Sequence, residues 1–215
     1  MGRGGGDRSG ANRGSTGTEG GSVLPVPPGL VINLPNSDAY TRGVEYLRVM
    51  QTLVPEPAMV DVMSNLRDRT TICVWIGTHI WAVNETLQQC LLACHECFHV
   101  HQRRYITIYA VPLAQPYQLD GLCNISTNPT TILIDAGRVA PEHWLSIVAH
   151  EYAHAHLGSP GHDPRFARVL AHLCLGLGLQ PPSAETEAGL RSHPPYIPTS
   201  DPLAFWRGET ITVGR

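Results

Sequence analysis

The stretch that most constrains the fold of this chain is His150-Glu151-Tyr152-Ala153-His154, an H-E-x-x-H pattern. On an α-helix, residues four apart lie about 40° apart around the axis and one turn along it, so His150 and His154 can bind one ion together. Glu151 lies roughly 100° from His150, on the flank of the same face. There it can reach a water molecule on the ion without being a ligand, as a general base requires. The pattern therefore predicts a helix with the chemistry of a zinc hydrolase.

The segments around the pattern predict where this helix begins and ends. The apolar strand TTILID (130–135) comes first, and Pro141 follows at the expected first helical turn. The helix is expected to run through about Leu157, because the sequence GSPG at residues 158–161 cannot continue it. Beyond this break comes His162, where the chain can turn back toward the helix, so His162 is the expected third ligand. The alternative is a buried helix whose histidines are incidental.

Other residues near the pattern are weaker candidates for the metal site. His156 projects roughly 120–160° away from the two ligand positions on the helix, so it should pack or face solvent. His143 falls on the ligand face but about 10 Å along the axis, too far to share the ion. His172 lies in the next apolar segment and is expected to pack there. Asp163 stays open as an alternative third ligand, or as a residue that orients a ligating imidazole.

The sequence VAHEYAHAHL, followed by GHDPRF and the apolar segment ARVLAHLCLGL, resembles the SprT-like metallopeptidases and related small zincin-like proteins. The resemblance covers about residues 118–178. It implies a zinc site in which His150, His154 and His162 are the ligands and Glu151 is the general base. Phe166 matches the aromatic residue that follows the third ligand in the family.

The chain departs from the family pattern at three points. Asp163 stands where Gly is usual, the loop between the second and third histidines is short, and no cysteine-pair zinc ribbon follows. The resemblance implies a peptidase, whereas the DNA-repair role of some family members is not carried over. The basic residues also argue against nucleic acid: all 15 are Arg, and they form no cluster beyond the pairs Arg67/Arg69 and Arg103/Arg104.

A second candidate site is the cysteine series Cys90, Cys94 and Cys97, whose C-x3-C-x2-C spacing is that of radical-SAM iron–sulfur proteins. On a helix these three residues fall, with His101, within about 60° of one another and beside apolar side chains. Because a free cysteine packs as a small hydrophobe, this face is expected to be buried core. A second metal or redox site on this helix stays open as the alternative. The remaining cysteines are expected to be buried thiols in a reducing compartment: Cys73, Cys123 and Cys174.

The hydrophobic pattern predicts an α+β fold with a small mixed sheet. The H-E-x-x-H active-site helix and the family resemblance imply that this fold is zincin-like. Ser37 is the expected N-cap of the first helix, and Gly77–Thr78 the expected turn of a hairpin. Asn84 is the expected N-cap of the cysteine helix, and Asn128-Pro129 a turn between two strands, one of which should form the sheet edge beside the metal. The expected helices are 38–54, a short turn within 55–66, 85–102 and 166–179, and the expected strands are 70–83 (a hairpin), 103–113, 121–126 and 130–135.

The 215 residues predict one domain with tails. Residues 1–28 are expected to be a disordered Gly/Pro-rich tail, since residues 1–22 are almost devoid of apolar side chains. Residues 29–180 are the expected metallopeptidase domain, and 181–215 a Pro-rich C-terminal tail that wraps the domain or stays loose. The sequence has no run of about 20 apolar residues and no signal-peptide core, which predicts a cytoplasmic protein with no membrane association.

Together these features predict a zinc-dependent metallopeptidase that hydrolyses peptide bonds through a metal-activated water, with a protein or peptide as its substrate. Glu151 would transfer the proton of this water to the leaving amine. Tyr196 and His193 are candidates for stabilising the oxyanion. Two alternatives remain: a catalytically silent zinc-bound module that binds peptides, and a metal or redox protein centred on the cysteine helix.

Overall fold

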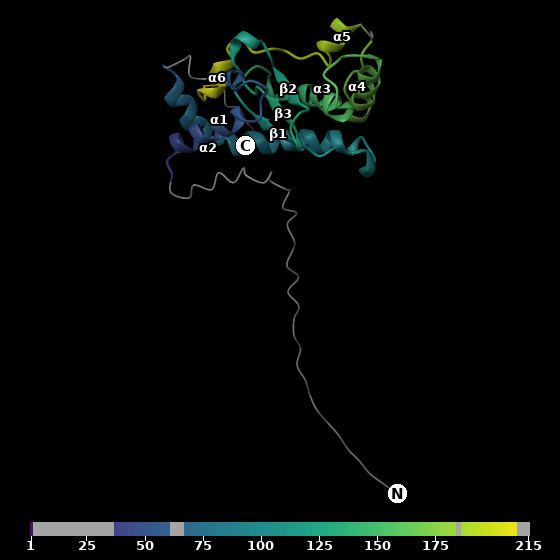
Figure 1. The fold of residues 1–215 in the computed structure, drawn as a ribbon, viewed down its shortest axis with the longest axis horizontal. Helices are drawn as coiled ribbons and strands as arrows, with labels where there is room; N and C mark the ends of the chain where they lie inside the picture. Colours follow the sequence, from purple (N-terminus) through teal and green to yellow (C-terminus); the bar gives the residue numbers. More distant parts are fainter. Residues whose placement is uncertain (2–36, 61–66, 184–185, 210–215) are drawn as a thin grey trace.

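A computed structural model describes Met1 and residues 37–60, 67–183 and 186–209. The described residues form an α+β fold of six α-helices and a three-stranded mixed sheet (Figure 1), which confirms the α+β class and the small mixed sheet of the prediction. The α-helices are α1 (Ala39–Gln51), α2 (Arg69–Glu96), α3 (Trp144–Leu157), α4 (Pro164–Leu177), α5 (Glu187–Arg191) and α6 (Pro202–Trp206). The strands are β1 (Ile106–Ala110), β2 (Gly121–Asn124) and β3 (Thr130–Ile134), and the 3-10 helices are η1 (Pro57–Met59), η2 (Val100–Gln102), η3 (Gln115–Tyr117) and η4 (Pro141–His143).

The long helix α2 replaces the predicted hairpin at 70–83, and that prediction was wrong. The helix predicted for 85–102 is present as far as Glu96, but as the second part of α2 and not as a separate helix. The run TTICVWIGTHIWAV contains many β-formers, but its buried positions recur at helical intervals, among them Ile72, Ile76 and Val83. Gly77 makes no turn. A Cβ atom placed there would lie 1.9 Å from the carbonyl oxygen of Ala39, so this glycine lets α1 pack directly on α2.

Asn84, predicted to cap a helix, lies inside α2 and joins it to the sheet. Its Oδ1 accepts a hydrogen bond of 2.8 Å from the backbone N–H of Ala110, and its Nδ2 lies 3.2 Å from the hydroxyl of Tyr46. The predicted N-cap of α1 was one residue off, because Asp38, not Ser37, accepts the hydrogen bond from the backbone N–H of Thr41.

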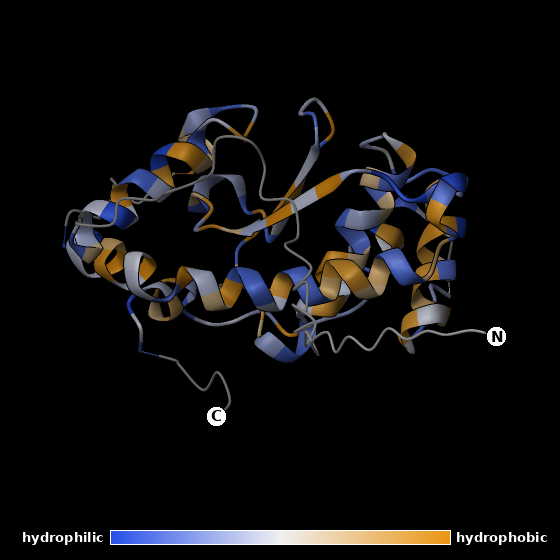
Figure 2. Cartoon of the chain, turned by 90° about the horizontal axis from the view of Figure 1, so that it is seen from below, coloured by the Kyte–Doolittle hydropathy of each residue, from blue (hydrophilic) through white to orange (hydrophobic). Residues whose placement is uncertain are grey.

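The sheet has the order β1-β3-β2, with β1 parallel and β2 antiparallel to β3. Cys123 of β2 pairs with Ile132 of β3, and the two strands flank the predicted turn at Asn128-Pro129. The sheet packs against α2 at β1 and against α3 at β2 and β3. Its hydrophobic strands and the hydrophobic positions of the helices build the core (orange in Figure 2). Among the described strands β2 pairs with β3 alone, so it is an edge strand of this sheet, and α3 lies beside it.

Residues 186–209 return to the body of the protein after α4. Leu190 and Trp206 are fully buried, and Val139 and Pro198 form an isolated β-bridge. This stretch thus wraps the domain, one of the two behaviours expected of the tail. The predicted disorder of residues 1–22 lies outside the described residues, and the predicted domain boundaries stay predictions. Among the described residues, no α-helix is long and apolar enough to span a membrane.

Candidate metal centre and its cavity

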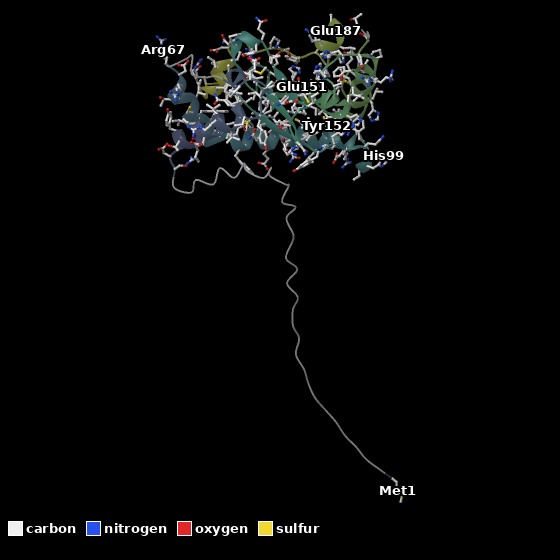
Figure 3. All side chains as sticks on the ribbon, in the orientation of Figure 1. Met1, Arg67, His99, Glu151, Tyr152 and Glu187 are labelled. Carbon is white, nitrogen blue, oxygen red and sulfur yellow. The ribbon has the colours of Figure 1, made fainter. Side chains whose placement is uncertain are left out.

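Helix α3 presents the H-E-x-x-H residues inside the protein. His150, Glu151 and His154 are all more than nine-tenths buried, and Figure 3 shows Glu151 and Tyr152 within the body of the molecule. The helix ends as predicted at Leu157. Gly158 takes the left-handed conformation with a φ of 63°, and its N–H donates to the carbonyl of His154 over 2.9 Å. Few residues other than glycine adopt this conformation at low cost, so Gly158 sets where the chain turns back.

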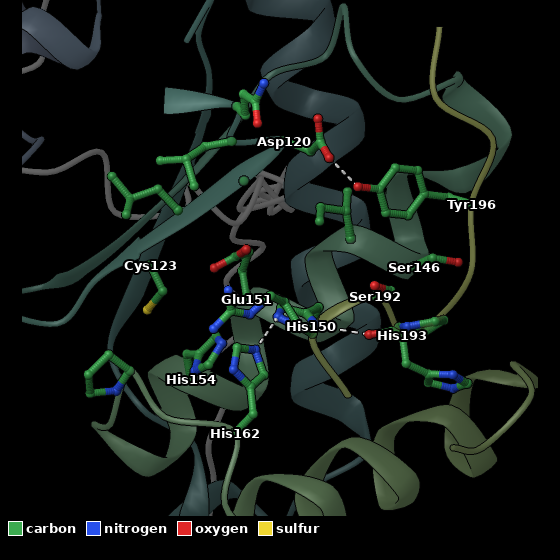
Figure 4. A pocket seen from close by; sticks show the side chains of 18 of the residues that line it. Asp120, Cys123, Ser146, His150, Glu151, His154, His162, Ser192, His193 and Tyr196 are labelled. Atoms are coloured by element: carbon green, nitrogen blue, oxygen red, sulfur yellow. Dashed lines mark hydrogen bonds between the residues drawn. The ribbon is translucent and has the colours of Figure 1, made fainter. Parts of the chain in front are cut away.

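The turn brings His162 to the two histidines of α3 (Figure 4). One ring nitrogen from each of His150, His154 and His162 lies within 4.8 Å of the other two, and the Nε2 atoms of His150 and His162 are 3.1 Å apart. In a tetrahedral zinc site with Zn–N bonds of about 2.0–2.1 Å, ligand nitrogens lie roughly 3.3 Å apart. The three-histidine cluster therefore fits a metal ion, and it is the sole group of this kind found among the described His, Cys, Asp and Glu residues.

Backbone carbonyls hold two of these imidazoles in the orientation that a ligand needs. Nδ1 of His150 lies 2.8 Å from the carbonyl oxygen of His193, and Nδ1 of His154 lies 2.9 Å from that of Ser159. A carbonyl can only accept, so each Nδ1 carries a proton and each Nε2 keeps a free lone pair. Burial lowers the pKa of His150 to about 3 and that of His154 to about 4, so both rings are neutral near pH 7.

Residues at the start of α4 pack against the three-histidine cluster. The buried ring of Phe166 lies 4.4–5.1 Å, centroid to centroid, from the rings of His150, His154 and His162. Asp163 caps α4: its carboxylate accepts hydrogen bonds from the backbone N–H groups of Arg165 and Phe166. Asp163 is not in the cluster, and its capping role explains why an acidic residue follows His162.

The carboxyl group of Glu151 lies beside the cluster against the edge strand β2 (Figure 4). A Cβ atom at Gly121 would lie 2.8 Å from its Oε1. Burial raises the pKa of Glu151 to about 8, the charge of Asp120 raises it further, and the backbone N–H of Cys123 opposes both. A cation at the cluster would lower this pKa and favour the carboxylate.

The three-histidine cluster and the carboxyl group of Glu151 share a cavity of about 520 Å³. Its walls come from α3, from the segment 117–123 that includes β2, and from residues 191–194 and 196 of the C-terminal segment. Both candidates for oxyanion stabilisation line it. The phenol of Tyr196 donates to the carboxylate of Asp120, whereas the ring of His193 is held by the carbonyl of Gln180, 2.7 Å from its Nε2.

His156 and His172, which the sequence did not indicate as ligands, both lie away from the three-histidine cluster. His156 stacks on Phe98 with ring centroids 4.2 Å apart, on the side of α3 that faces α2. His172, expected to be packed, is exposed, with its Nε2 2.7 Å from the carbonyl oxygen of Cys97. Its ring lies beside the end of α2, 4.9 Å from the ring of Phe98 between centroids.

Cys90 and Cys94 lie on α2, and Cys97 is its C-cap. The three residues pack as part of one helix face. Cys94 is fully buried, and Cys90 and Cys97 are half-buried. Burial raises the pKa of all three thiols, so they stay protonated and weakly reactive near pH 7. Elsewhere, Cys73 and Cys174 are buried as predicted, whereas Cys123 is half-buried and lines the cavity.

Several residues of the site could not be identified from the sequence. The carbonyl groups of Ser159 and His193 act through the backbone, which leaves no side-chain signal. Gly121 is the first residue of the expected strand 121–126 and Asp120 precedes it, and a glycine in a strand is only a weak sign of close backbone approach. Comparisons with protein-family models, with curated proteins and with solved structures found no match.

Proposed function

We propose that this protein is a zinc-dependent metallopeptidase of the zincin type, similar to the SprT-like peptidases that its motif resembles. The observation that carries the proposal is the buried carboxyl group of Glu151, which lies beside the three-histidine cluster and shares its cavity. A purely structural metal site has no use for such a group, because burying an acid without need costs stability. An acid beside three neutral ligands is the arrangement that hydrolysis requires.

Zinc is the ion that the donor set favours. Three imidazole nitrogens within 4.8 Å of one another suit Zn²⁺, and three protein ligands leave a fourth position open, as in catalytic zinc sites. An ion bound there would act as a Lewis acid and lower the pKa of water toward neutrality.

The residues of the chain would then move the protons of peptide hydrolysis. Glu151 accepts a proton from the water as its oxygen attacks the scissile carbonyl carbon, and later gives this proton to the leaving amine nitrogen as the C–N bond breaks. The close contact with Gly121 restricts where the carboxyl group can lie during both transfers.

The substrate would be a protein or peptide in extended form. The edge strand β2 forms one wall of the cavity, and an extended peptide can pair with a free strand edge. Pairing there would lay the peptide along β2 and bring a carbonyl group next to Glu151 and the cluster.

Digestion of an unbiased peptide library by the purified protein tests this function. The expected result is cleavage that requires one zinc per chain, stops with a chelator and returns when zinc is restored. A zinc-loaded protein that cleaves no peptide would instead support a silent peptide-binding module. Bound iron with visible absorbance would favour the cysteine helix as the functional centre.

A further inference from the structure

The C-terminal segment 186–209, here called the strap, touches both the metal centre and a distant anchor. At the metal end, the carbonyl of His193 accepts the Nδ1 proton of His150, and Arg191, Ser192, Pro194 and Tyr196 line the cavity. The strap then runs to α6, which packs against the opposite part of the protein (Figure 1).

The anchor is built on the loop between β3 and η4. Trp206 is fully buried, and its Nε1 donates to Oδ1 of Asp135 over 2.8 Å. The backbone N–H of Thr199 donates to the carbonyl of Arg138 over 2.9 Å. At Gly137 the fit is so close that a Cβ atom would lie 2.2 Å from the carbonyl oxygen of Pro202. The anchor therefore holds the strap in one register on this loop.

That register decides where the carbonyl of His193 lies. The bridge of Pro198 to Val139 belongs to the same anchor, and between the anchor and the metal centre the hydrogen bond from Tyr196 to Asp120 ties the strap to the protein. If the strap leaves, His150 loses the acceptor that fixes its ring and its tautomer. Loss of such an outer partner typically weakens metal affinity about 10–100-fold.

We propose that the strap is a working part of the metal centre, and that Trp206 is a positioning residue for the ligand His150. Docking of the strap and binding of the metal are then coupled. Coupling is reciprocal, so bound metal must favour docking of the strap by the same factor by which the docked strap favours metal binding. This inference requires only the metal centre and not peptidase activity.

The first test uses the unaltered protein and trypsin. Bound zinc should slow cleavage after Arg191, in the strap, about 5-fold or more, as followed by mass spectrometry. Cleavage after Arg48 on the remote helix α1 should not change, and a free reference peptide corrects for any effect of zinc on trypsin. An equal rate after Arg191 with and without zinc overturns the proposal, and so does equal slowing at both sites.

The second test measures zinc affinity of full-length variants by competition with a chromophoric chelator. Trp206→Ala should weaken zinc binding about 10-fold or more, and Trp206→Phe, which keeps an aromatic ring in the anchor, should weaken it less. Met50→Ala is the matched control, because Met50 is fully buried on α1, outside the strap and the cavity. Parent-like affinity in Trp206→Ala, or an equal loss in Met50→Ala, contradicts the proposal.

Discussion

Gly121 on the edge strand lies against Glu151 on α3 so closely that no side chain fits between them. A Cβ atom at position 121 would lie 2.8 Å from Oε1 of Glu151, 3.0 Å from its Cγ and 3.2 Å from its Cδ. The backbone of β2 therefore fixes one side of the carboxyl group, and the backbone N–H of Cys123 favours its ionised form.

Gly121→Ala is accordingly expected to displace Glu151 and to slow peptide hydrolysis about 10–100-fold, since misplacement by about 1 Å can cost this much. Zinc affinity should stay at the parent value, because the atoms nearest to an added Cβ at Gly121 all belong to Glu151 and not to the three histidines. The matched control is Gly161→Ala, where an added methyl meets only Oγ of Ser159, at 3.9 Å. Unchanged turnover in Gly121→Ala would show that the carboxyl group needs no such support.

Glu151→Gln is expected to keep the fold and the zinc and to lose hydrolysis, because the amide cannot accept the proton of the attacking water. Bound zinc is measured by metal analysis and turnover by peptide cleavage. Loss of zinc would make Glu151 a ligand, and undiminished turnover would remove it from the mechanism.

The third ligand is tested by three variants at and near the turn after α3. His162→Ala should weaken zinc binding by more than the roughly 10–100-fold that loss of an outer partner costs. Asp163→Ala should weaken it only modestly, because this residue caps α4 and a lost cap costs about 1 kcal/mol of stability. His156→Ala should leave the affinity alone, since its ring stacks on Phe98. A zinc titration in which the His162 variant matches the parent would refute this assignment.

The metal helix was predictable from the sequence because its signals are local. The spacing of His150 and His154 requires a helix, and Gly158 marks its end, so the ligand face and the break both follow from a few adjacent residues. The hairpin prediction at 70–83 failed because a glycine such as Gly77 can indicate either of two structures, a turn or a close contact between two helices. Only the distant residue Ala39 distinguishes them.

The same reasoning predicts that Gly77→Ala destabilises the protein by about 2 kcal/mol or more, as overpacking between two backbones does. The free energy of unfolding is measured in urea. Thr78→Ala, an exposed change on the next residue of α2, should alter this free energy by no more than about 0.5 kcal/mol. Similar values for the two variants would mean that α1 can move away from α2 at little cost.

The backbone carbonyl that orients the ligand His150 could not be predicted from the sequence for a different reason. His193 was considered for its imidazole, but the contact with His150 comes from its backbone carbonyl. Any residue at position 193 has this carbonyl, so only the docking of the strap, set by contacts such as that of Trp206 with Asp135, makes it part of the site.

The cysteine helix gives the last prediction, because two interpretations of one spacing differ in a measurable way. Single replacements of Cys90, Cys94 and Cys97 by Ala should each cost about 1–2 kcal/mol of stability, with the largest loss at Cys94, which is fully buried. Zinc should remain at one per chain, since burial keeps these thiols protonated and a metal needs the thiolate. Gln89→Ala, exposed on the same helix, serves as the control for stability. If any of the three cysteine variants loses one metal equivalent, this face of α2 is a binding site and not packed core.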